Sequence, residues 1–458
     1  MTILKGRARA ILLFLPIVPA YPQLPMGLAD AVERAREHYP SVAVSRSQVE
    51  AAAAGIRLAR TSYRPRLDSI AQVNRATRNN LYGMLLMQPV ISPISGPPVE
   101  ETSTASVFGS AVGLLFDWEP FDFGLRRAQV ELAESARRRT DAAVVRSQFE
   151  AGAAAADAYL TVMAARETVK AARAGVERSH VWLKVVQALV RAELRPGADE
   201  ALAQAELAAA EAQVIQGELA IADATALLAG LTGSTPATLQ VDEGRMLAMP
   251  EEQTAPGGEL AANPLAREQS AAVDEARSRL RTLDKQWVPR FSVQGTSYAR
   301  GTGARPDFTV LGGANGLAPT FYNWGLGFSV QFPLLENEPV RARQAEQSAN
   351  IRTEENRYKL ILTELETRRN RALAAVDAAR RMARLTPTQL AAARTAETQA
   401  QARYKAGLAS VMEVADTQRL LAQSEIDDGL ARLNVWRAVL ALRTAEGDLE
   451  PFLRMAGN

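Results

Sequence analysis

Two acidic residues near the end of the chain, Glu413 and Asp416, are the strongest candidates for a site that acts on a substrate or an ion. They are three residues apart in a segment whose pattern predicts a helix, so both carboxylates lie on one helix face. Such a pair can attract cations, but a helix dipole also favours acidic residues in an ordinary first turn. The sequence leaves both interpretations open. No partner base accompanies the pair, so a catalytic role is not indicated.

The chain lacks the residues on which most catalytic and metal sites depend. Its 458 residues include no cysteine, which excludes a thiolate metal site and a cysteine nucleophile. The two histidines, His38 and His180, are interpreted as helix-surface residues that lie too far apart for a histidine-rich metal site. With no serine–histidine–aspartate set and no phosphate-binding loop, we expect no enzyme activity and no cofactor. The 53 basic and 51 acidic side chains give a net charge of +2, which implies no nucleic acid partner.

The first twenty residues have the pattern of a secretory signal. Lys5, Arg7 and Arg9 precede an apolar run over residues 10–18, and we expect cleavage near Ala20. This run is too short to span a bilayer, and no cysteine follows the cleavage point to carry a lipid. No later stretch of about eighteen uninterrupted apolar residues occurs, so we expect no transmembrane helix.

The sequence repeats itself once along its length. Residues 39–67 align without a gap with residues 263–291, so that Pro40 matches Pro264. The predicted domain organisation follows from this repeat. It comprises a signal peptide (1–20), a first repeat (21–232), an inter-repeat equatorial segment (233–262), a second repeat (263–447) and a C-terminal tail (448–458).

Each repeat is predicted to contain a helix, two strands, a very long helix, a tight turn and a second long helix. The expected helices cover 27–62, 121–194, 199–231, 264–287, 338–406 and 410–447, and the expected strands cover 66–78, 106–118, 290–300 and 321–332. At ~1.5 Å per residue the two longest helices each span on the order of 100 Å. Pro387 interrupts one of them and is expected to kink it.

The predicted strands alternate between an apolar face and a smaller, more polar face. Strands of about eleven residues with aromatic ends are typical of an outer-membrane barrel. The expected aromatic residues at the membrane interfaces are Trp118, Tyr322, Trp324 and Phe332. A small soluble sandwich would show the same alternation and stays open as an alternative.

The small number of strands limits how a barrel can form. In lipid every backbone N–H and C=O must be paired, so a sheet has to close on itself. Four strands are too few, since about eight are needed to leave room for interior side chains. If these strands lie in a membrane, several chains must therefore share one barrel, and three chains would supply twelve strands. The alanine-rich apolar positions of the long helices favour close, coiled-coil packing that would continue the same wall outside the membrane.

Several motifs together resemble the TolC family of outer-membrane efflux and secretion ducts. They are the repeat itself, the junction Trp118-Glu119-Pro120-Phe121-Asp122-Phe123-Gly124 with Arg126-Arg127, its counterpart Phe332-Pro333-Leu334-Leu335, and the segment YKAGLASVMEVADTQ from Tyr404 to Gln418. Each motif is weak by itself. Their order along nearly the whole mature chain carries the resemblance.

This resemblance implies a mainly α-helical fold with a small membrane β part. The implied assembly is a homotrimer in which a twelve-stranded β-barrel continues into a twelve-helix α-barrel tunnel. The implied location is the outer membrane, in contact with its lipid and extending into the periplasm. The duct would export small molecules such as drugs and toxic compounds, or polypeptides as in type I secretion. Its implied partners are an inner-membrane transporter and a periplasmic adaptor.

The resemblance also implies roles for individual residues. It places adaptor docking at Arg195-Pro196-Gly197 and at Gly407-Leu408-Ala409-Ser410. In a trimer Glu413 and Asp416 would recur as acidic rings of the pore gate, and such rings bias a pore toward cations. Tyr404 matches a gate position whose hydroxyl helps to tie the closed end of the tunnel to neighbouring helices.

The sequence departs from the family pattern at two places. Ala409 stands where the family often has an arginine, and the junction 336–339 lacks the usual pair of glycines. The alternative function is a soluble periplasmic coiled-coil adaptor or scaffold without a membrane barrel. It would use the helical hairpins but leave the alternating strands unexplained.

Overall fold

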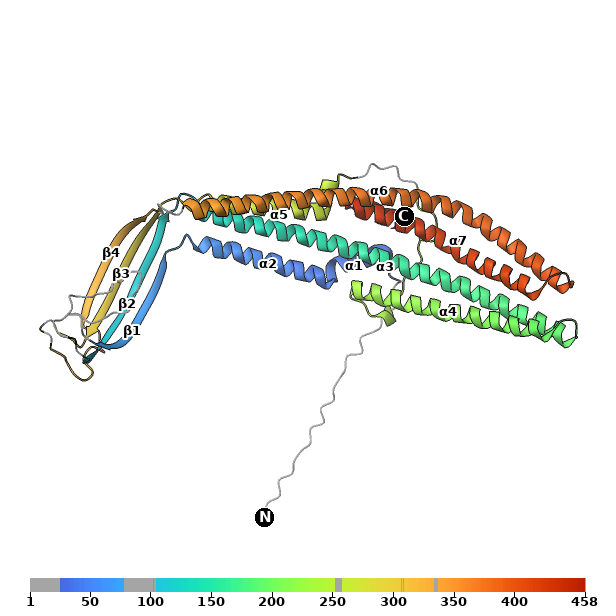
Figure 1. The fold of residues 1–458 in the computed structure, drawn as a ribbon, viewed down its shortest axis with the longest axis horizontal. Helices are drawn as coiled ribbons and strands as arrows, with labels where there is room; N and C mark the ends of the chain where they lie inside the picture. The colour runs from blue at the N-terminus through green and yellow to red at the C-terminus, as the bar shows by residue number, and fades with distance from the viewer. Residues whose placement is uncertain are drawn as a thin grey trace, which may run out of the picture. The chain divides into compact units, whose positions relative to one another are not determined.

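The structure is a computed structural model that describes residues 25–77, 102, 104–251, 258–305, 307, 309–332 and 337–457. The predicted signal peptide and the residues Pro333 to Glu336 of the second strand–helix junction lie outside this described part. The fold is mainly helical with one small antiparallel sheet (Figure 1). This confirms the fold class predicted from the sequence.

Along the chain, the helices and strands follow the order expected from the repeat. The helices are α1 (Leu28–His38), α2 (Pro40–Thr61), α3 (Leu125–Arg191), α4 (Gly197–Thr232), α5 (Pro264–Leu283), α6 (Asn337–Lys405), α7 (Val411–Glu446) and α8 (Glu450–Gly457), with short 3-10 helices η1 (Pro236–Thr238) and η2 (Leu260–Ala262). The strands are β1 (Arg66–Thr77), β2 (Ser106–Phe121), β3 (Arg290–Thr302) and β4 (Phe321–Gln331).

The chain divides into two compact units, each built from separate stretches of sequence. One unit takes residues 1–42, 148–258 and 367–458, and the other takes residues 43–147 and 259–366. We call them the helical unit and the sheet unit. They do not follow the two sequence repeats, whose boundaries stay a prediction.

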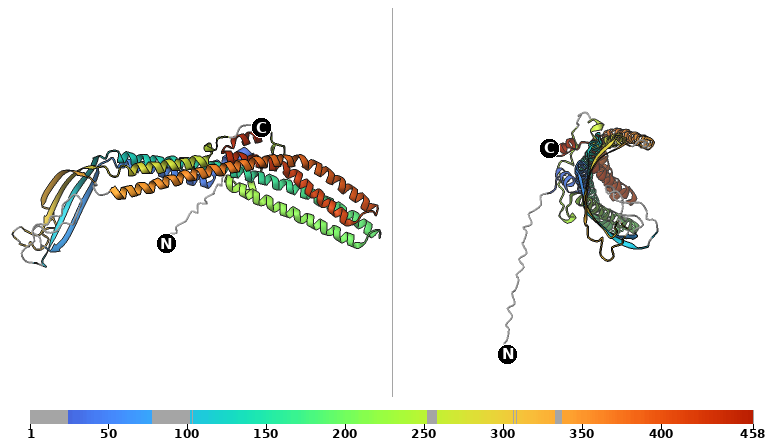
Figure 2. Two further views of the ribbon diagram at one scale, coloured as in Figure 1. Left: turned by 45° about the horizontal axis from the view of Figure 1, so that its top comes forward. Right: turned by 90° about the vertical axis from the view of Figure 1, so that its left-hand side faces the viewer.

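The sheet unit contains one four-stranded antiparallel sheet in the order β1-β2-β3-β4, whose strands lie side by side in Figures 1 and 2. Residues that face each other across the strands share one face of the sheet. One such row is Phe116, Gly295 and Leu326. The outer strands β1 and β4 each pair with one neighbour among the described residues. Each therefore presents an open backbone edge.

The two faces of the sheet differ in character, as the alternation predicts. Large apolar side chains of one face are exposed along β2 and β4: Val112, Leu114, Trp118, Tyr322, Trp324, Leu326, Phe328 and Val330. The other face contains polar contacts between and within strands. Gln294 of β3 donates a hydrogen bond of 3.0 Å to Asp117 of β2, and Arg66 pairs with Asp68 of the same strand at 2.7 Å. An exposed apolar face of this extent indicates a surface that contacts a membrane or another protein.

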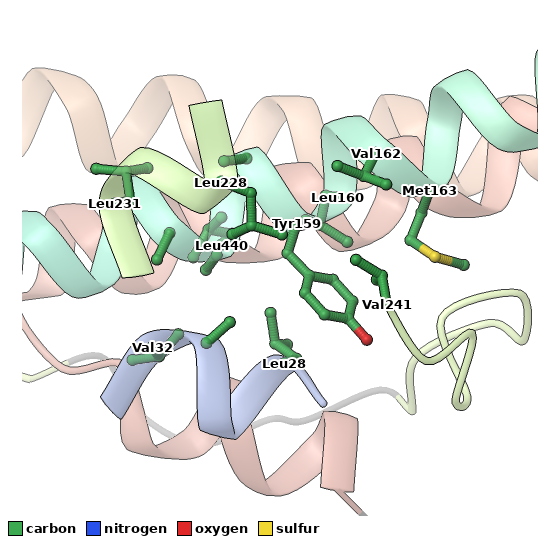
Figure 3. Close-up of a cluster of buried hydrophobic side chains, with 14 of the residues drawn as sticks. Leu28, Val32, Tyr159, Leu160, Val162, Met163, Leu228, Leu231, Val241 and Leu440 are labelled. Carbon is green, nitrogen blue, oxygen red and sulfur yellow. The ribbon is translucent and has the colours of Figure 1, made fainter. Parts of the chain in front are cut away.

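The helical unit contains a large apolar cluster, shown in Figure 3, and a smaller one that includes Trp182 and Tyr404. Tyr159 of α3 is buried in the large cluster and donates hydrogen bonds to the backbone carbonyls of Met26, at 3.4 Å, and of Asp242. Arg166 donates to the carbonyl of Val241 at 2.8 Å. These contacts fasten the start of the described chain and the 233–251 stretch to α3. Burial and the nearby Asp242 raise the pKa of Tyr159, so its phenol stays a donor.

One helix prediction was wrong because of a proline, and another helix tolerates one. The single helix expected over 27–62 is divided at Tyr39, which has an extended backbone (φ −63°, ψ 130°). A residue that precedes proline avoids the helical region, and Pro40 then begins α2. The helix expected over 338–406 is confirmed as α6, which continues through Pro387, and the kink expected there stays a prediction.

The first strand–helix junction also differs from its prediction. The strand was expected to end at 118 and the helix to begin at 121, but β2 continues to Phe121 through a bulge. Helix α3 begins at Leu125 because Asp122 accepts hydrogen bonds from the backbone N–H groups of Gly124, at 3.1 Å, and Arg126, at 2.6 Å. An aspartate that accepts from the first amides of a helix fixes its start.

One helix of the described residues, α4, is long and apolar enough by length and composition to cross a membrane. This is weak support for a transmembrane helix, because core helices of soluble proteins pass the same test. The helix also carries acidic residues in ion pairs with other helices. Glu206 pairs with Arg419, and Glu218 pairs with Arg173 at 2.8 Å.

Candidate functional site at the helical turns

The helical unit contains two tight turns between long helices, and most of the site residues expected from the sequence lie in these turns or within a few residues of them. We call residues 192–196 the α3–α4 turn and residues 406–410 the α6–α7 turn. The two turns have the same backbone pattern. The N–H of Leu194 bonds to the carbonyl of Leu189 at 3.0 Å, and that of Leu408 bonds to the carbonyl of Arg403 at 2.8 Å.

This shared pattern is a Schellman-type helix end, which needs one residue in the left-handed region. Gly407 fills that position in the α6–α7 turn with φ 80°, and Glu193 fills it in the α3–α4 turn with φ 58°. Ser410 then caps α7 by accepting a hydrogen bond from the N–H of Glu413 at 3.2 Å. The equivalent position before α4 is Pro196, which has no side-chain cap.

Tyr404, in the last turn of α6, is completely buried between the hairpins. Its hydroxyl donates a hydrogen bond of 2.7 Å to Asp199 of α4. Its ring packs edge-on against Trp182 of α3, with centroids 4.9 Å apart, and lies under the guanidinium of Arg195 at 4.2 Å. Burial, followed by the hydrogen bond to Asp199, raises the pKa of Tyr404. The tyrosine is therefore a neutral donor that joins α6 to α3 and α4.

The two acidic gate candidates lie on α7, and each has an arginine partner. Glu413 pairs with Arg403 at 2.7 Å, and Asp416 pairs with Arg419 at 3.3 Å. Arg419 also forms a two-point ion pair with Glu206 of α4, which raises the pKa of Arg419. The acidic pair is thus largely charge-compensated within the chain.

Sequence analysis missed the partners of these residues. Asp199, Arg403 and Arg419 were not singled out, although Arg419 is three residues after Asp416 and on the same helix face. Asp199 lies 205 positions from Tyr404 along the chain, so no local pattern connects them.

The residues of the two turns present different surfaces. Leu194 and Leu408 occupy equivalent positions and are exposed to 69% and 71%. Ala409 is buried, and Arg195 is directed at Tyr404. Glu193, Pro196 and Ser410 are also exposed, so each turn presents more than its leucine to a partner.

The expected membrane-interface aromatics are all exposed in the single chain: Trp118, Tyr322, Trp324 and Phe332. Trp118 also donates a hydrogen bond of 3.3 Å to the backbone carbonyl of Tyr63. Among the residues that the structure describes, no group of three or more histidine, cysteine or acidic side chains is arranged to hold a metal ion.

The sequence matches the family described as outer membrane efflux protein over residues 31–234 and 256–448. Together these ranges cover most of the chain. The protein belongs to the outer membrane efflux protein family. The resemblance to TolC-type ducts is thereby confirmed. A comparison with curated proteins gives no significant match.

Solved structures of outer-membrane channels have the same fold as this family member. The outer-membrane channel OprN is 21% identical with a TM-score of 0.71, and the match covers 92% of this chain and 89% of that one. The CmeC channel of Campylobacter jejuni is 16% identical with a TM-score of 0.73 and coverages of 92% and 85%. The MtrE channel of Neisseria gonorrhoeae, in its open state, is 18% identical with a TM-score of 0.68 and coverages of 92% and 89%.

Family membership establishes the broad function. This efflux protein is an outer-membrane transport conduit that extends into the periplasm, and it is not an enzyme.

Proposed function

We propose that this efflux protein assembles as a homotrimer that forms one continuous duct, with a twelve-stranded barrel in the outer membrane and a twelve-helix tunnel in the periplasm. One observation carries the proposal. The four-stranded sheet has open edges at β1 and β4 and an apolar face that is exposed along its length. Both edges have to be paired in lipid, and copies of the same sheet supply the missing partners.

The duct works with two partners, an inner-membrane transporter that supplies the energy and a periplasmic adaptor that connects the two membranes. The proposed docking sites for the adaptor are Arg195-Pro196-Gly197 and Gly407-Leu408-Ala409-Ser410, at the α3–α4 and α6–α7 turns. The exposure of Leu194 and Leu408 at equivalent positions supports this assignment, because both side chains are accessible to a partner. The proposed cargo is small toxic molecules or polypeptides.

The proposed gate consists of Tyr404, Glu413 and Asp416. Tyr404 joins the end of α6 to α4 through Asp199. Glu413 and Asp416 are at least partly exposed, with 39% and 64% of their side-chain surfaces accessible. In a trimer these two carboxylates recur three times around the lumen, together with the arginines that pair with them.

Fractionation followed by channel recording tests this proposal. The mature protein should require detergent for extraction from outer membranes, migrate as a trimer that dissociates on heating, and form ion channels in planar bilayers. Recovery of the protein as a water-soluble monomer that never associates with bilayers would overturn the proposal. That outcome would favour the soluble adaptor or scaffold instead.

A further inference from the structure

Arg195 reaches from the α3–α4 turn to the end of another helix, α6. Its guanidinium lies 4.2 Å from the centre of the Tyr404 ring and donates a hydrogen bond to the Tyr404 backbone carbonyl. The arginine is half-buried, and the tyrosine beneath it is completely buried. A planar guanidinium can stack on a ring and donate a hydrogen bond at the same time, which an ammonium group does poorly.

The carbonyl that Arg195 binds has a particular place in α6. The helix ends at Lys405, so the Tyr404 carbonyl is one of the last four, which have no partner within the helix. The N–H of Gly407 also bonds to it, at 3.0 Å. A cation at this end of a helix is favoured by the helix dipole as well as by the hydrogen bond. Arg195 therefore caps α6 from a different hairpin.

The repeat makes this arrangement asymmetric. Leu194 and Leu408 have equivalent backbone hydrogen bonds, so the residue after each leucine is also equivalent. Arg195 follows the first leucine and Ala409 follows the second. Of these two equivalent residues, only Arg195 has a side chain long enough to reach the other turn. The turn that it binds is the one in which Ala409 occupies the equivalent position.

We propose that Arg195 is a positioning residue that fastens the α6–α7 turn to the α3–α4 turn within one chain, so that the gate opens only when this contact breaks. The inference rests on the proposed function as a gated duct. It removes Arg195 from the set of adaptor contacts, because its side chain is occupied by Tyr404. An adaptor that displaced this guanidinium would release the end of α6.

Single-channel recording of three variants tests the role in gating. Arg195→Gln removes both the charge and the planar guanidinium, whereas Arg195→Lys keeps only the charge. Arg191→Gln changes an exposed arginine at the end of α3 and is the matched control. Arg195→Gln should raise the ratio of open to closed time by about tenfold, the size expected for the loss of one charge-assisted hydrogen bond. Arg195→Lys should give a smaller rise, and Arg191→Gln should behave as the wild type.

Hydrogen–deuterium exchange on the same full-length trimers supplies a readout that does not depend on conduction. Arg195→Gln should speed exchange of the amides of Gly407 and Leu408, which form the turn fastened to Arg195. Unchanged exchange in Arg195→Gln would show that this contact does not hold the α6–α7 turn in place. Faster exchange with wild-type gating would overturn its role in the gate. Wild-type trimers that never conduct would instead overturn the proposed duct, while the exchange experiment would still decide whether Arg195 holds the turn.

Discussion

The hydroxyl of Tyr404 donates a hydrogen bond of 2.7 Å to the carboxylate of Asp199, and this contact joins the last turn of α6 to the first turn of α4. The two residues belong to different repeats and different hairpins. Tyr404 is completely buried and Asp199 is half-buried, so the bond is partly shielded from water. Partial burial should make this bond resist separation of the hairpins more than a fully exposed ion pair does.

Tyr404→Phe should weaken the closed state of the duct. The change removes the hydroxyl but keeps the ring and the backbone carbonyl that Arg195 binds, so only the contact with Asp199 is lost. We expect a loss of about 1–2 kcal/mol from the closed state and longer open times in planar bilayers. Asp199→Asn is the matched control, because its amide oxygen still accepts from the hydroxyl. Equal open times in wild type and Tyr404→Phe would contradict a gating role for this bond.

The hydrogen bond between Tyr404 and Asp199 should be lost in strong alkali, so the duct should close less well at high pH. Burial and the hydrogen bond to Asp199 raise the pKa of Tyr404 above the usual value of 10.0. A raised pKa means that the neutral tyrosine is favoured in the folded protein, so its contribution is fully present below about pH 10 and is lost as the pH rises through the raised value. Open time should therefore show no Tyr404-dependent change from pH 6 to 9 and should increase only in stronger alkali. The measurement is open time against pH, and in Tyr404→Phe this alkaline component should be absent.

The pairing of Glu413 with Arg403 predicts how the gate charge can be changed. Arg403→Gln leaves the Glu413 carboxylate without this partner, so the reversal potential in a salt gradient should shift toward cation selectivity and block by divalent cations should strengthen. Glu413→Gln should shift both properties the other way. Since both side chains of the pair are more than a third exposed, each change should alter stability by less than about 1 kcal/mol. Identical reversal potentials in both variants would place Glu413 outside the conducting path.

The sequence predicted the features that depend on local periodicity. The alternation in β2 and β4, including Trp118 and Trp324, gave the apolar face correctly, and the turn at Gly407 was expected from its glycine. Contacts between distant segments were not predictable. The family resemblance places adaptor docking at Arg195, but nothing near this residue in the sequence indicates that it binds Tyr404. The start of α3 likewise depends on the cap formed by Asp122.

The two turns should respond in opposite ways to changes at their left-handed residues. Glu193 has φ 58°, a conformation that is strained for any residue with a β-carbon, so Glu193→Gly should stabilise the α3–α4 turn by up to about 1 kcal/mol. Gly407→Ala should destabilise the α6–α7 turn by about 1 kcal/mol or more, because alanine is disfavoured at φ 80°. Hydrogen–deuterium exchange of each turn measures both effects. Slower exchange in Gly407→Ala would contradict the assigned backbone strain.

An arginine placed on each face of β4 should separate the proposed lipid face from the proposed lumen. Leu326 is 74% exposed on the apolar face, whereas Gly327 lies in register with Gln294 and its neighbour Asp117 on the polar face. If the apolar face contacts lipid, Leu326→Arg should cost about 2–4 kcal/mol near the middle of the membrane.

Gly327→Arg is the matched control for this experiment, because no atom lies within 4 Å of a β-carbon added there. Its guanidinium would enter the polar face near Asp117, so assembly should be retained. The measurement is the fraction of protein recovered as a heat-dissociable trimer from outer membranes. We expect this fraction to fall sharply for Leu326→Arg only. The reverse order would mean that the polar face, rather than the apolar one, contacts lipid, and equal recovery of both variants would mean that β4 is not in the membrane.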